Sequence, residues 1–304
     1  MGDAPRPGVP GRHGTDGAAR VDAVVVTYDS ASTIDACLCA LLGQPGIARV
    51  CVVDNGSRDG TVARVEAIAR EEARVHLSRL AHNPGFAAAC NAGADAPGDA
   101  RSPWLLFVNP DVELPAGALG RLLGHAAARP RLGALGADLR DAAGQRDAAA
   151  RRHDLTLSRV LASVGGRDAL AIAVAPSLAL QPVDACSGAL MLVPRAAFDA
   201  VGGWDAGYRL HVEDLDFCRR LRHAGWTIAV ANDVPVLHHR GVSSRSRPGF
   251  VEWHKHRGLW RYWWRFDARG PAALLAPLVA GALAGRLLLV AWPLAFARRV
   301  VRRR

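Results

Sequence analysis

Lysine is almost absent from this chain of 304 residues, in which Lys255 is the only one. Arginine therefore carries nearly all of the net charge of +10, and arginines crowd residues 298–304. The chain also lacks a recognisable nucleic-acid-binding motif, and a terminal basic cluster beside an apolar stretch favours anionic lipid over DNA. Such a tail can also be ordinary solvated charge. We expect a membrane surface, and no nucleic acid, among the partners.

Cysteine pairs of the CxxC type are missing as well, and residues 1–20 contain no apolar core of a secretory signal. Both absences favour a reducing compartment, with buried free thiols and the cytoplasm as the location. Because residues 1–20 are rich in Gly, Pro, Ala and Arg, we expect a disordered leader there. The six cysteines are Cys37, Cys39, Cys51, Cys90, Cys186 and Cys218.

From residue 21 onward, short β-branched runs alternate with segments of helical spacing. This alternation predicts an α/β fold with a mostly parallel, Rossmann-like sheet flanked by helices. The expected strands are residues 23–28, 49–53, 74–77 and 104–108, and the expected helices are 32–42, 61–72 and 85–94.

The pattern is less regular in the second half of the chain. We expect a helix at 114–128, a strand at 183–193, a helix near Ala196 and another from Glu213. The segment from about 140 to 180 is rich in Ala and Arg without a clear period. It is either a flap over the acceptor side or an ordinary surface excursion.

Asp54 follows two apolar residues in the run VVDNGSRDGT, at the carboxyl end of an expected strand. Open α/β sheets bind ligands at this edge, so Asp54 is a candidate for binding a nucleotide. Thr27, Tyr28 and Asp29 reach the same edge from the first strand. The alternative is a turn or helix-cap role for Asp54, although Asp59 or Ser57 can supply that cap instead.

Two further motifs indicate a nucleotide diphosphate. The run NPGFAAACNAG opens a helix whose N–H groups suit a pyrophosphate, although small-residue helices more often serve packing. In Asn109-Pro110-Asp111, Asp111 can hold a divalent cation together with phosphate oxygens, the alternative being a Pro-Asp turn. We expect Asn83, Asn91 and Asn109 to bind the nucleotide sugar.

Glu213, Asp214 and Asp216 fall in the first turn of an expected helix. The helix dipole favours acids there, but three exceed what capping needs. A carboxylate at a helix start can take the proton from an attacking hydroxyl, so Asp214 is the candidate base and Glu213 orients the acceptor or the loop. His238, at a strand end before a glycine, either completes a metal site with Asp111 or belongs to a surface histidine pair.

These motifs occur in an order that resembles the family 2 inverting glycosyltransferases, and more narrowly their bacterial rhamnosyltransferase-like members. The resemblance covers residues from about 21 to 244. It implies a GT-A fold, a nucleotide-sugar donor and a divalent metal, Mg²⁺ or Mn²⁺. By position, Asp54 would contact the nucleotide, Asp111 would be the acidic metal residue, Asp214 the catalytic base, and His238 the histidine near metal or diphosphate. The motifs are VVVTYDS, VVDNGSRDGT, NPGFAAACNAG, FVNPDVEL, CSGALMLV, GGWDAGYRLHVEDLDFCRRLRHAGW and HHRGVSS.

Three features depart from the fuller family pattern. Asp29 stands where the first-strand motif usually ends in Asn, and Asn109 stands where fuller metal motifs carry a second acid. A site with one carboxylate depends on the ligand's phosphates, so we expect weak metal binding without donor. No glutamine follows Gln181, so the Gln-x-x-Arg-Trp motif of processive polymerases is missing. That favours the addition of one or a few sugars.

The resemblance implies transfer of a sugar with inversion to a lipid-linked or cell-surface glycan, in cell wall or polysaccharide biosynthesis. Rhamnose from dTDP-rhamnose is the first choice, and galactosyl, mannosyl or glucosyl transfer are alternatives. A non-catalytic, membrane-associated nucleotide-sugar-binding protein is a further alternative. We expect a glycosyltransferase domain at 21–250, with a nucleotide-binding half at 21–112 and an acceptor half at 113–250, followed by a tail at 251–304.

The tail combines tryptophans and arginines with a nearly apolar stretch at 272–297. The stretch is long enough for a bilayer core, but Arg286 splits it, and Pro277 and Pro293 are expected to bend it. A helix pair lying in the membrane interface fits better than a clean span, the alternative being a buried core helix or a dimer surface. We expect the protein at the inner face of the cell membrane.

Overall fold

The structure is a computed structural model. It describes residues 20–96, 101–156, 158–159, 170–239 and 248–301, with the backbone alone for 290–301. The leader expected at residues 1–20 falls almost wholly outside the described residues, as does the end of the HHRGVSS motif.

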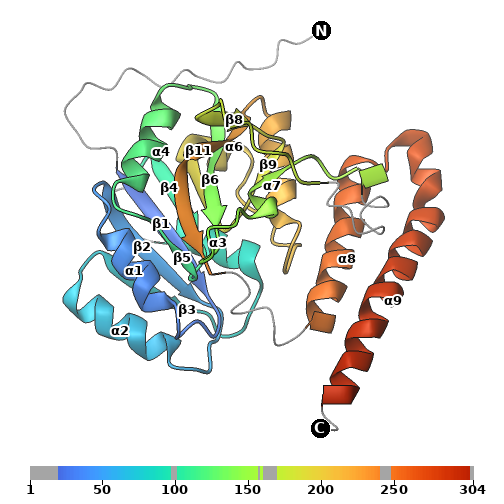
Figure 1. Ribbon diagram of the computed structural model, residues 1–304, viewed down its shortest axis with the longest axis horizontal. Helices are drawn as coiled ribbons and strands as arrows, with labels where there is room; N and C mark the ends of the chain where they lie inside the picture. Colours follow the sequence, from blue (N-terminus) through green and yellow to red (C-terminus); the bar gives the residue numbers. More distant parts are fainter. Residues whose placement is uncertain (1–19, 97–100, 157, 160–169, 240–247, 302–304) are drawn as a thin grey trace.

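A nine-stranded sheet forms the centre of the described part of the chain (Figure 1). Its strands are β1 (Val21–Thr27), β2 (Ile47–Asp54), β3 (Val75–Arg79), β4 (Trp104–Val108), β5 (Val112–Glu113), β6 (Leu132–Arg140), β8 (Leu180–Pro182), β10 (Leu190–Pro194) and β11 (Thr227–His238). The order is β3-β2-β1-β4-β10-β6-β11-β5, and β8 pairs with β11. Strands β3, β2, β1 and β4 are parallel, so their carboxyl ends meet at one edge.

Helices cover both faces of the sheet because side chains alternate along each strand. In β1, Ala23 and Val25 pack with helices α1, α2 and α4, whereas Val24 and Val26 pack with α3, α6 and α7. The helices are α1 (Ile34–Leu42), α2 (Thr61–Glu71), α3 (Phe86–Ala94), α4 (Ala118–Ala127), α6 (Arg195–Ala200), α7 (Glu213–His223), α8 (Pro248–Phe266) and α9 (Ala276–Val301). The predicted α/β class is confirmed, and strands up to β4 agree with the sequence expectation to within a few residues.

Two elements differ from the expectation. The strand expected at 183–193 is divided into β9 (Ala185–Cys186) and β10, with Gly188 between them. The segment from 140 to 180 contributes a short 3₁₀ helix, η1 (Ala148–Ala150), and the strand β7 (Arg151–Arg152), which pairs with β9 in a second small sheet. Part of this segment, residues 157 and 160–169, lies outside the described residues. The described part is tied to the fold by buried Arg151, which binds Asp138 (2.6 Å).

The tail forms a hairpin of two helices, α8 and α9, joined by the 3₁₀ helix η3 (Gly270–Leu275) and standing beside the sheet (Figure 1). Residues 272–297 therefore do not form a helix pair of their own. Pro277 is tolerated because it lies in the first turn of α9. Arg286 does not split the helix, since it donates to His256 Nε2 on α8 (2.8 Å) while His256 Nδ1 donates to the Glu252 carbonyl (2.7 Å).

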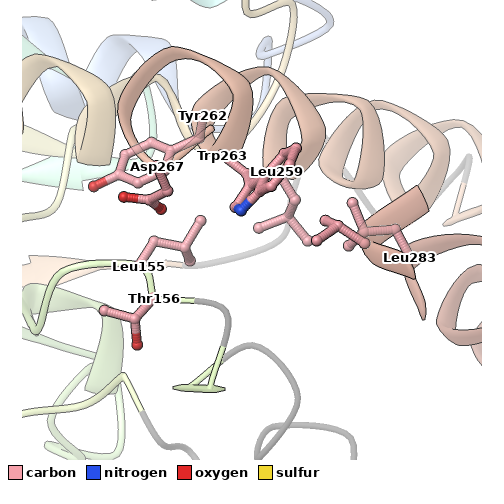
Figure 2. Close-up of a pocket in the computed structure, with 8 residues that line it drawn as sticks. Leu155, Thr156, Leu259, Tyr262, Trp263, Asp267 and Leu283 are labelled. Carbon is pink, nitrogen blue, oxygen red and sulfur yellow. The ribbon is translucent and has the colours of Figure 1, made fainter. Parts of the chain in front are cut away.

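The hairpin also packs against the part of the chain that carries the sheet. Leu155 and Thr156 face Leu259, Trp263 and Leu283 across a narrow apolar crevice (Figure 2). On the outside, Leu274, Leu278, Leu288 and Leu289 remain exposed. Within the described residues, one stretch, Gly270–Leu289, has the length and composition to cross a membrane, with a mean hydropathy of 1.9 and 11% of its residues buried.

Candidate active site

The Asp54 carboxylate lies at the carboxyl edge of the parallel strands and is held by its own turn. It is buried, and its Oδ2 accepts hydrogen bonds from the backbone N–H groups of Gly56 and Ser57 (3.0 Å each). Its Oδ1 accepts from Thr27 Oγ1 at the end of β1 (3.1 Å). Asp59 caps α2 through the Thr61 N–H (2.9 Å), as expected, but Asp54 still serves the turn.

The neighbouring loop from β1 is fixed by an unusual backbone. Asp29 has φ 51°, a left-handed conformation that Asn and Asp tolerate better than most residues. Its N–H donates to Ser57 Oγ (2.9 Å), and its carboxylate accepts from the Arg58 N–H (2.8 Å). The two loops that follow β1 and β2 therefore brace each other, while Tyr28 and Asp29 keep part of their surface accessible.

The asparagines of the NPGFAAACNAG run have structural partners. Asn83 accepts from the Gly85 N–H (2.9 Å), and Asn91 makes two hydrogen bonds to the Trp204 backbone, each 2.8 Å long. Asn55, which the sequence analysis passed over, has a buried Oδ1 without a hydrogen-bond partner among the described residues. A buried, unpaired amide oxygen beside Asp54 is an acceptor left for a ligand.

Asp111 and His238 lie together, next to the end of β4. Asp111 Oδ1 is 3.5 Å from His238 Nε2, and Asp147 Oδ2 is 3.4 Å from His238 Nδ1. Burial lowers the pKa of His238, but Asp111 and Asp147 outweigh it and raise that pKa to about 9. No group of three or more His, Cys, Asp or Glu side chains in the described ranges is arranged to hold a metal ion.

Asp214, in the first turn of α7, is the best-defined candidate base. Arg152 from β7 forms an ion pair with its Oδ2, which also accepts from the Gly188 N–H (3.2 Å). Its Oδ1 accepts from the Leu215 N–H (2.9 Å). Burial raises the pKa of Asp214, but the Arg152 charge and these hydrogen bonds outweigh it and leave the pKa below its ordinary value. The carboxylate is therefore ionised and able to accept a proton.

Glu213 differs sharply from its neighbour. It is buried, and its Oε2 has no hydrogen-bond partner among the described residues. Burial and the charge of Asp214 raise the pKa of Glu213 to about 8. The environments of the two carboxylates thus separate their pKa values, as in many acid–base sites.

The turn before these acids is strained. His211 (φ 64°) and Val212 (φ 71°) both adopt the left-handed conformation, which β-branched residues such as Val strongly disfavour. Asp216, the third acid, is committed to structure, because it pairs with Arg220 one turn later (2.6 Å) and accepts from Tyr208 (3.3 Å).

The short link between β9 and β10 brings the metal motif and the candidate base together. Gly188 donates its N–H to Asp214, and the next residue, Ala189, accepts a hydrogen bond from the Asn109 N–H (2.8 Å). A side chain at position 188 would also touch Phe86 at the start of α3, with Cβ 3.6 Å from Cε1. Asn109, Asp214 and α3 thus converge around one glycine.

Besides Asn55, three parts of this site were missed by sequence reasoning. Arg152 and Asp147 lie in the segment without periodicity, where two consecutive arginines gave no distinctive pattern. The third, Gly188, interrupts what reads as a continuous apolar strand. One arginine of this pair, Arg151, is buried. The pair could be recognised as part of the site only with the knowledge that β7 pairs with β9.

Comparison with known proteins assigns the family. Residues 22–164 match the model of "Glycosyl transferase family 2". The chain is 32% identical over 285 residues to the N-acetylglucosaminyl-diphospho-decaprenol L-rhamnosyltransferase of Mycobacterium tuberculosis, covering 84% of this chain and 91% of that protein. The chain belongs to glycosyltransferase family 2. It is a glycosyltransferase by family, which confirms the resemblance seen in the sequence.

Solved structures agree on the fold. GalNAc-T7 with UDP, GalNAc and Mn²⁺ superimposes with a TM-score of 0.60 at 14% identity, over 82% of this chain and 48% of that one, so the likeness spans about half of GalNAc-T7. The mannosyltransferase PcManGT of Pyrobaculum calidifontis, in complex with GDP-Man and Mn²⁺, gives a TM-score of 0.58 at 19% identity, over 91% of this chain and 80% of that one. The family 2 domain therefore has the GT-A fold.

Proposed function

We propose that this glycosyltransferase moves L-rhamnose from dTDP-rhamnose to a lipid-linked N-acetylglucosaminyl diphosphate, with inversion at the anomeric carbon. The observation that carries the choice of substrates is the match to the mycobacterial rhamnosyltransferase along almost its full length. The transferase chemistry is supported by the ionised Asp214 carboxylate, which lies close to the predicted metal and donor motifs.

In this proposal Asp214 takes the proton of the acceptor hydroxyl as that oxygen attacks the anomeric carbon. The carboxylate is held by Arg152 and Gly188, so its free lone pairs keep one direction. Glu213 would hydrogen-bond the acceptor or the turn, which is supported by its raised pKa and by an Oε2 that has no partner among the described residues. Proton transfer of this kind contributes on the order of 10²–10⁴ in rate.

Asp111 and His238 are the residues that would hold Mg²⁺ or Mn²⁺. Their oxygen and nitrogen atoms converge to 3.5 Å, and a divalent cation accepts such ligands, with the remaining positions filled by diphosphate oxygens. When bound, the cation supplies positive charge for the departing diphosphate. His238 must be neutral to ligate, so its position between Asp111 and Asp147 makes proton release part of metal binding.

The nucleotide would lie along the edge of the half at residues 21–112, against Thr27, Tyr28, Asp29 and Asp54. Asn83, Asn91 and Asn109 complete this proposed edge, Asn91 by holding the Trp204 loop. The half at 113–250 supplies the acceptor side.

The α8–α9 hairpin would place the enzyme on the inner face of the membrane. Exposed Leu278, Leu288 and Leu289 provide apolar contact, and Trp253 and Trp264 are exposed on α8. Burying apolar side chains in the acyl boundary stabilises each by about 1.5–3 kcal/mol relative to water.

The test is a transfer assay in detergent with N-acetylglucosaminyl-diphospho-decaprenol as acceptor. We expect product with dTDP-rhamnose and Mg²⁺ or Mn²⁺, no product after chelation, and the opposite anomeric configuration to the donor by NMR. UDP-GlcNAc and GDP-mannose serve as matched donors, and faster transfer from either of them overturns the rhamnosyl assignment.

A further inference from the structure

A cationic cavity lies between the loop before α7 and helix α8, beside Pro84 of the NPGFAAACNAG run and apart from the residues assigned above to metal and base. Its volume is about 230 Å³, many times the roughly 10–15 Å³ that a cavity needs to hold one water. Arg209 lines it from the loop, and His254 and Arg257 line it from α8. None of the described residues lining this cavity is acidic, so its lining attracts anions.

Arg209 and Arg257 are both exposed to solvent, and neither forms an ion pair with a described carboxylate. Asp205, the acid closest in sequence, is already paired with Arg261 (2.9 Å) and Arg265 (2.5 Å). Arg209 stacks over Phe250 at 5.6 Å, and Arg257 makes no ion pair with a described carboxylate. Guanidinium groups without a counter-ion in a concave site are the usual partners of phosphate oxygens.

The cavity is connected to the predicted base. The Arg209 carbonyl accepts from the Phe86 N–H (3.2 Å), and position 85 requires glycine, since its φ is 106° and a Cβ there would come within 2.5 Å of the Arg209 carbonyl oxygen. Phe86 in turn borders Gly188, whose N–H binds Asp214. The backbone of Arg209 is therefore linked, through Phe86 and Gly188, to the carboxylate that would deprotonate the acceptor.

The same cavity opens beside the hairpin that would contact the membrane. His254 and Arg257 flank the same turn of α8 as Trp253, which is 57% exposed. In an acceptor whose sugar is joined to a lipid through a diphosphate, the anionic diphosphate lies between the sugar and the lipid. A cationic cavity between the base and the membrane-facing helix matches that order.

We propose that the cavity lined by Arg209, His254 and Arg257 binds the diphosphate of a lipid-linked sugar acceptor. The proposal rests on the proposed function, and it assigns to these residues acceptor recognition rather than donor binding or proton transfer. Each arginine would donate charge-assisted hydrogen bonds to phosphate oxygens, while the sugar reaches towards Asp214 and the lipid follows the hairpin.

The kinetic test compares two acceptors on the full-length protein, N-acetylglucosaminyl-diphospho-decaprenol and the neutral octyl N-acetylglucosaminide. For Arg257→Gln and Arg209→Gln we expect the preference for the diphosphate acceptor, as a ratio of kcat/KM values, to fall by about tenfold each, with the KM for dTDP-rhamnose unchanged. The matched control is Arg121→Gln on α4, an exposed arginine on another part of the domain, which keeps the wild-type ratio. An unchanged ratio in the cavity variants overturns the proposal.

A binding test separates this proposal from failure of the proposed function. Vesicles of phosphatidylcholine containing N-acetylglucosaminyl-diphospho-decaprenol are compared with vesicles of equal charge containing phosphatidylglycerol. Weaker co-sedimentation of the variants with the diphosphate vesicles alone supports the acceptor site, even where no sugar is transferred. Equal weakening with both vesicles assigns the cavity to anionic lipid in general, and no weakening removes it as a phosphate site; both results overturn the proposal.

Discussion

Asp54 and Asp214 are both buried or nearly buried carboxylates at the start of a turn or helix, yet they are held in different ways. Asp54 is satisfied by two N–H groups of its own turn and by the adjacent strand. Asp214 depends on Arg152, which comes from a two-residue strand of a separate small sheet. Asp54 is thus fixed by neighbouring elements alone, whereas Asp214, which also accepts from the Gly188 and Leu215 N–H groups, has its pKa lowered by a side chain from a remote segment.

Replacing Asp214 should have the largest effect on activity. Asp214→Asn keeps the shape of the side chain but cannot take a proton, so we expect transfer to fall by about 10²–10⁴ while donor binding persists. The rate of rhamnosyl transfer measures the loss of activity, and calorimetric titration with dTDP-rhamnose measures donor binding. Asp35→Asn, at an exposed ion pair, is the control. Wild-type activity in Asp214→Asn would exclude it as the base.

Replacing Asp54 should instead reduce stability. Asp54→Ala leaves the N–H groups of Gly56 and Ser57 without their acceptor, so we expect a loss of about 2–4 kcal/mol in the free energy of unfolding. Urea unfolding measures it, with Asp35→Asn as the control. If Asp54→Ala is as stable as the wild type but binds donor weakly, the carboxylate serves donor binding and does not stabilise the turn.

Glu213 makes stability depend on pH. In the unfolded chain it ionises near its ordinary pKa of 4.5, whereas burial and Asp214 hold the folded pKa at about 8. The stabilising contribution of the protonated form is therefore fully present below pH 4.5 and is lost as the pH rises to about 8. Glu213→Gln should flatten this part of the stability profile in urea unfolding, whereas Glu66→Gln on α2 should keep the slope.

Replacing Arg152 should reduce the difference between Asp54 and Asp214 in how each carboxylate is held. In Arg152→Gln the pKa of Asp214 rises, so the acidic limb of the kcat/KM profile moves to higher pH, and transfer in that range falls by about tenfold. Arg146→Gln, which removes another ion pair of the same segment, is the control. An acidic limb that stays in place would show that Arg152 does not tune the base.

The smallest effect is expected where α8 touches the turn that carries the base. A Cβ at Gly258 would lie 3.2 Å from both the His211 carbonyl and Val212 Cγ2, so Gly258→Ala should displace the turn slightly and reduce kcat about two- to fivefold. Gly249→Ala in the same helix meets nothing within 4 Å and should retain full kcat. Equal rates in both variants would mean that the turn does not depend on this contact.

The sequence predicted the parallel part of the fold well because its strands are short apolar runs with clear ends. The strand β4 was expected with its observed bounds, Trp104–Val108. The candidate base and metal residues could be proposed because each lies at an end of a regular element, Asp214 in the first turn of α7 and Asp111 just after β4. Arg152 was not, since β7 has two residues and its pairing with β9 leaves no hydrophobic period.

The tail shows a second limit of sequence reasoning. Arg286 was expected to divide an apolar stretch, because a charged side chain is costly in lipid or in a core. Its cost is offset by His256, which lies 30 residues earlier in the chain and accepts its hydrogen bond across the hairpin. Such long-range pairing depends on how two helices face each other, which composition and spacing do not reveal.

The single lysine offers a practical consequence. Lys255 is half-buried in α8, where its charge contributes to the lowered pKa of His211 in the turn before Glu213 and Asp214. Because it carries the only side-chain amine in the chain, an amine-reactive fluorophore would label one internal position. Lys255 lies on the helix hairpin and acts electrostatically on the turn that precedes Glu213 and Asp214. The emission of the fluorophore would therefore report how the candidate active site responds when vesicles are added.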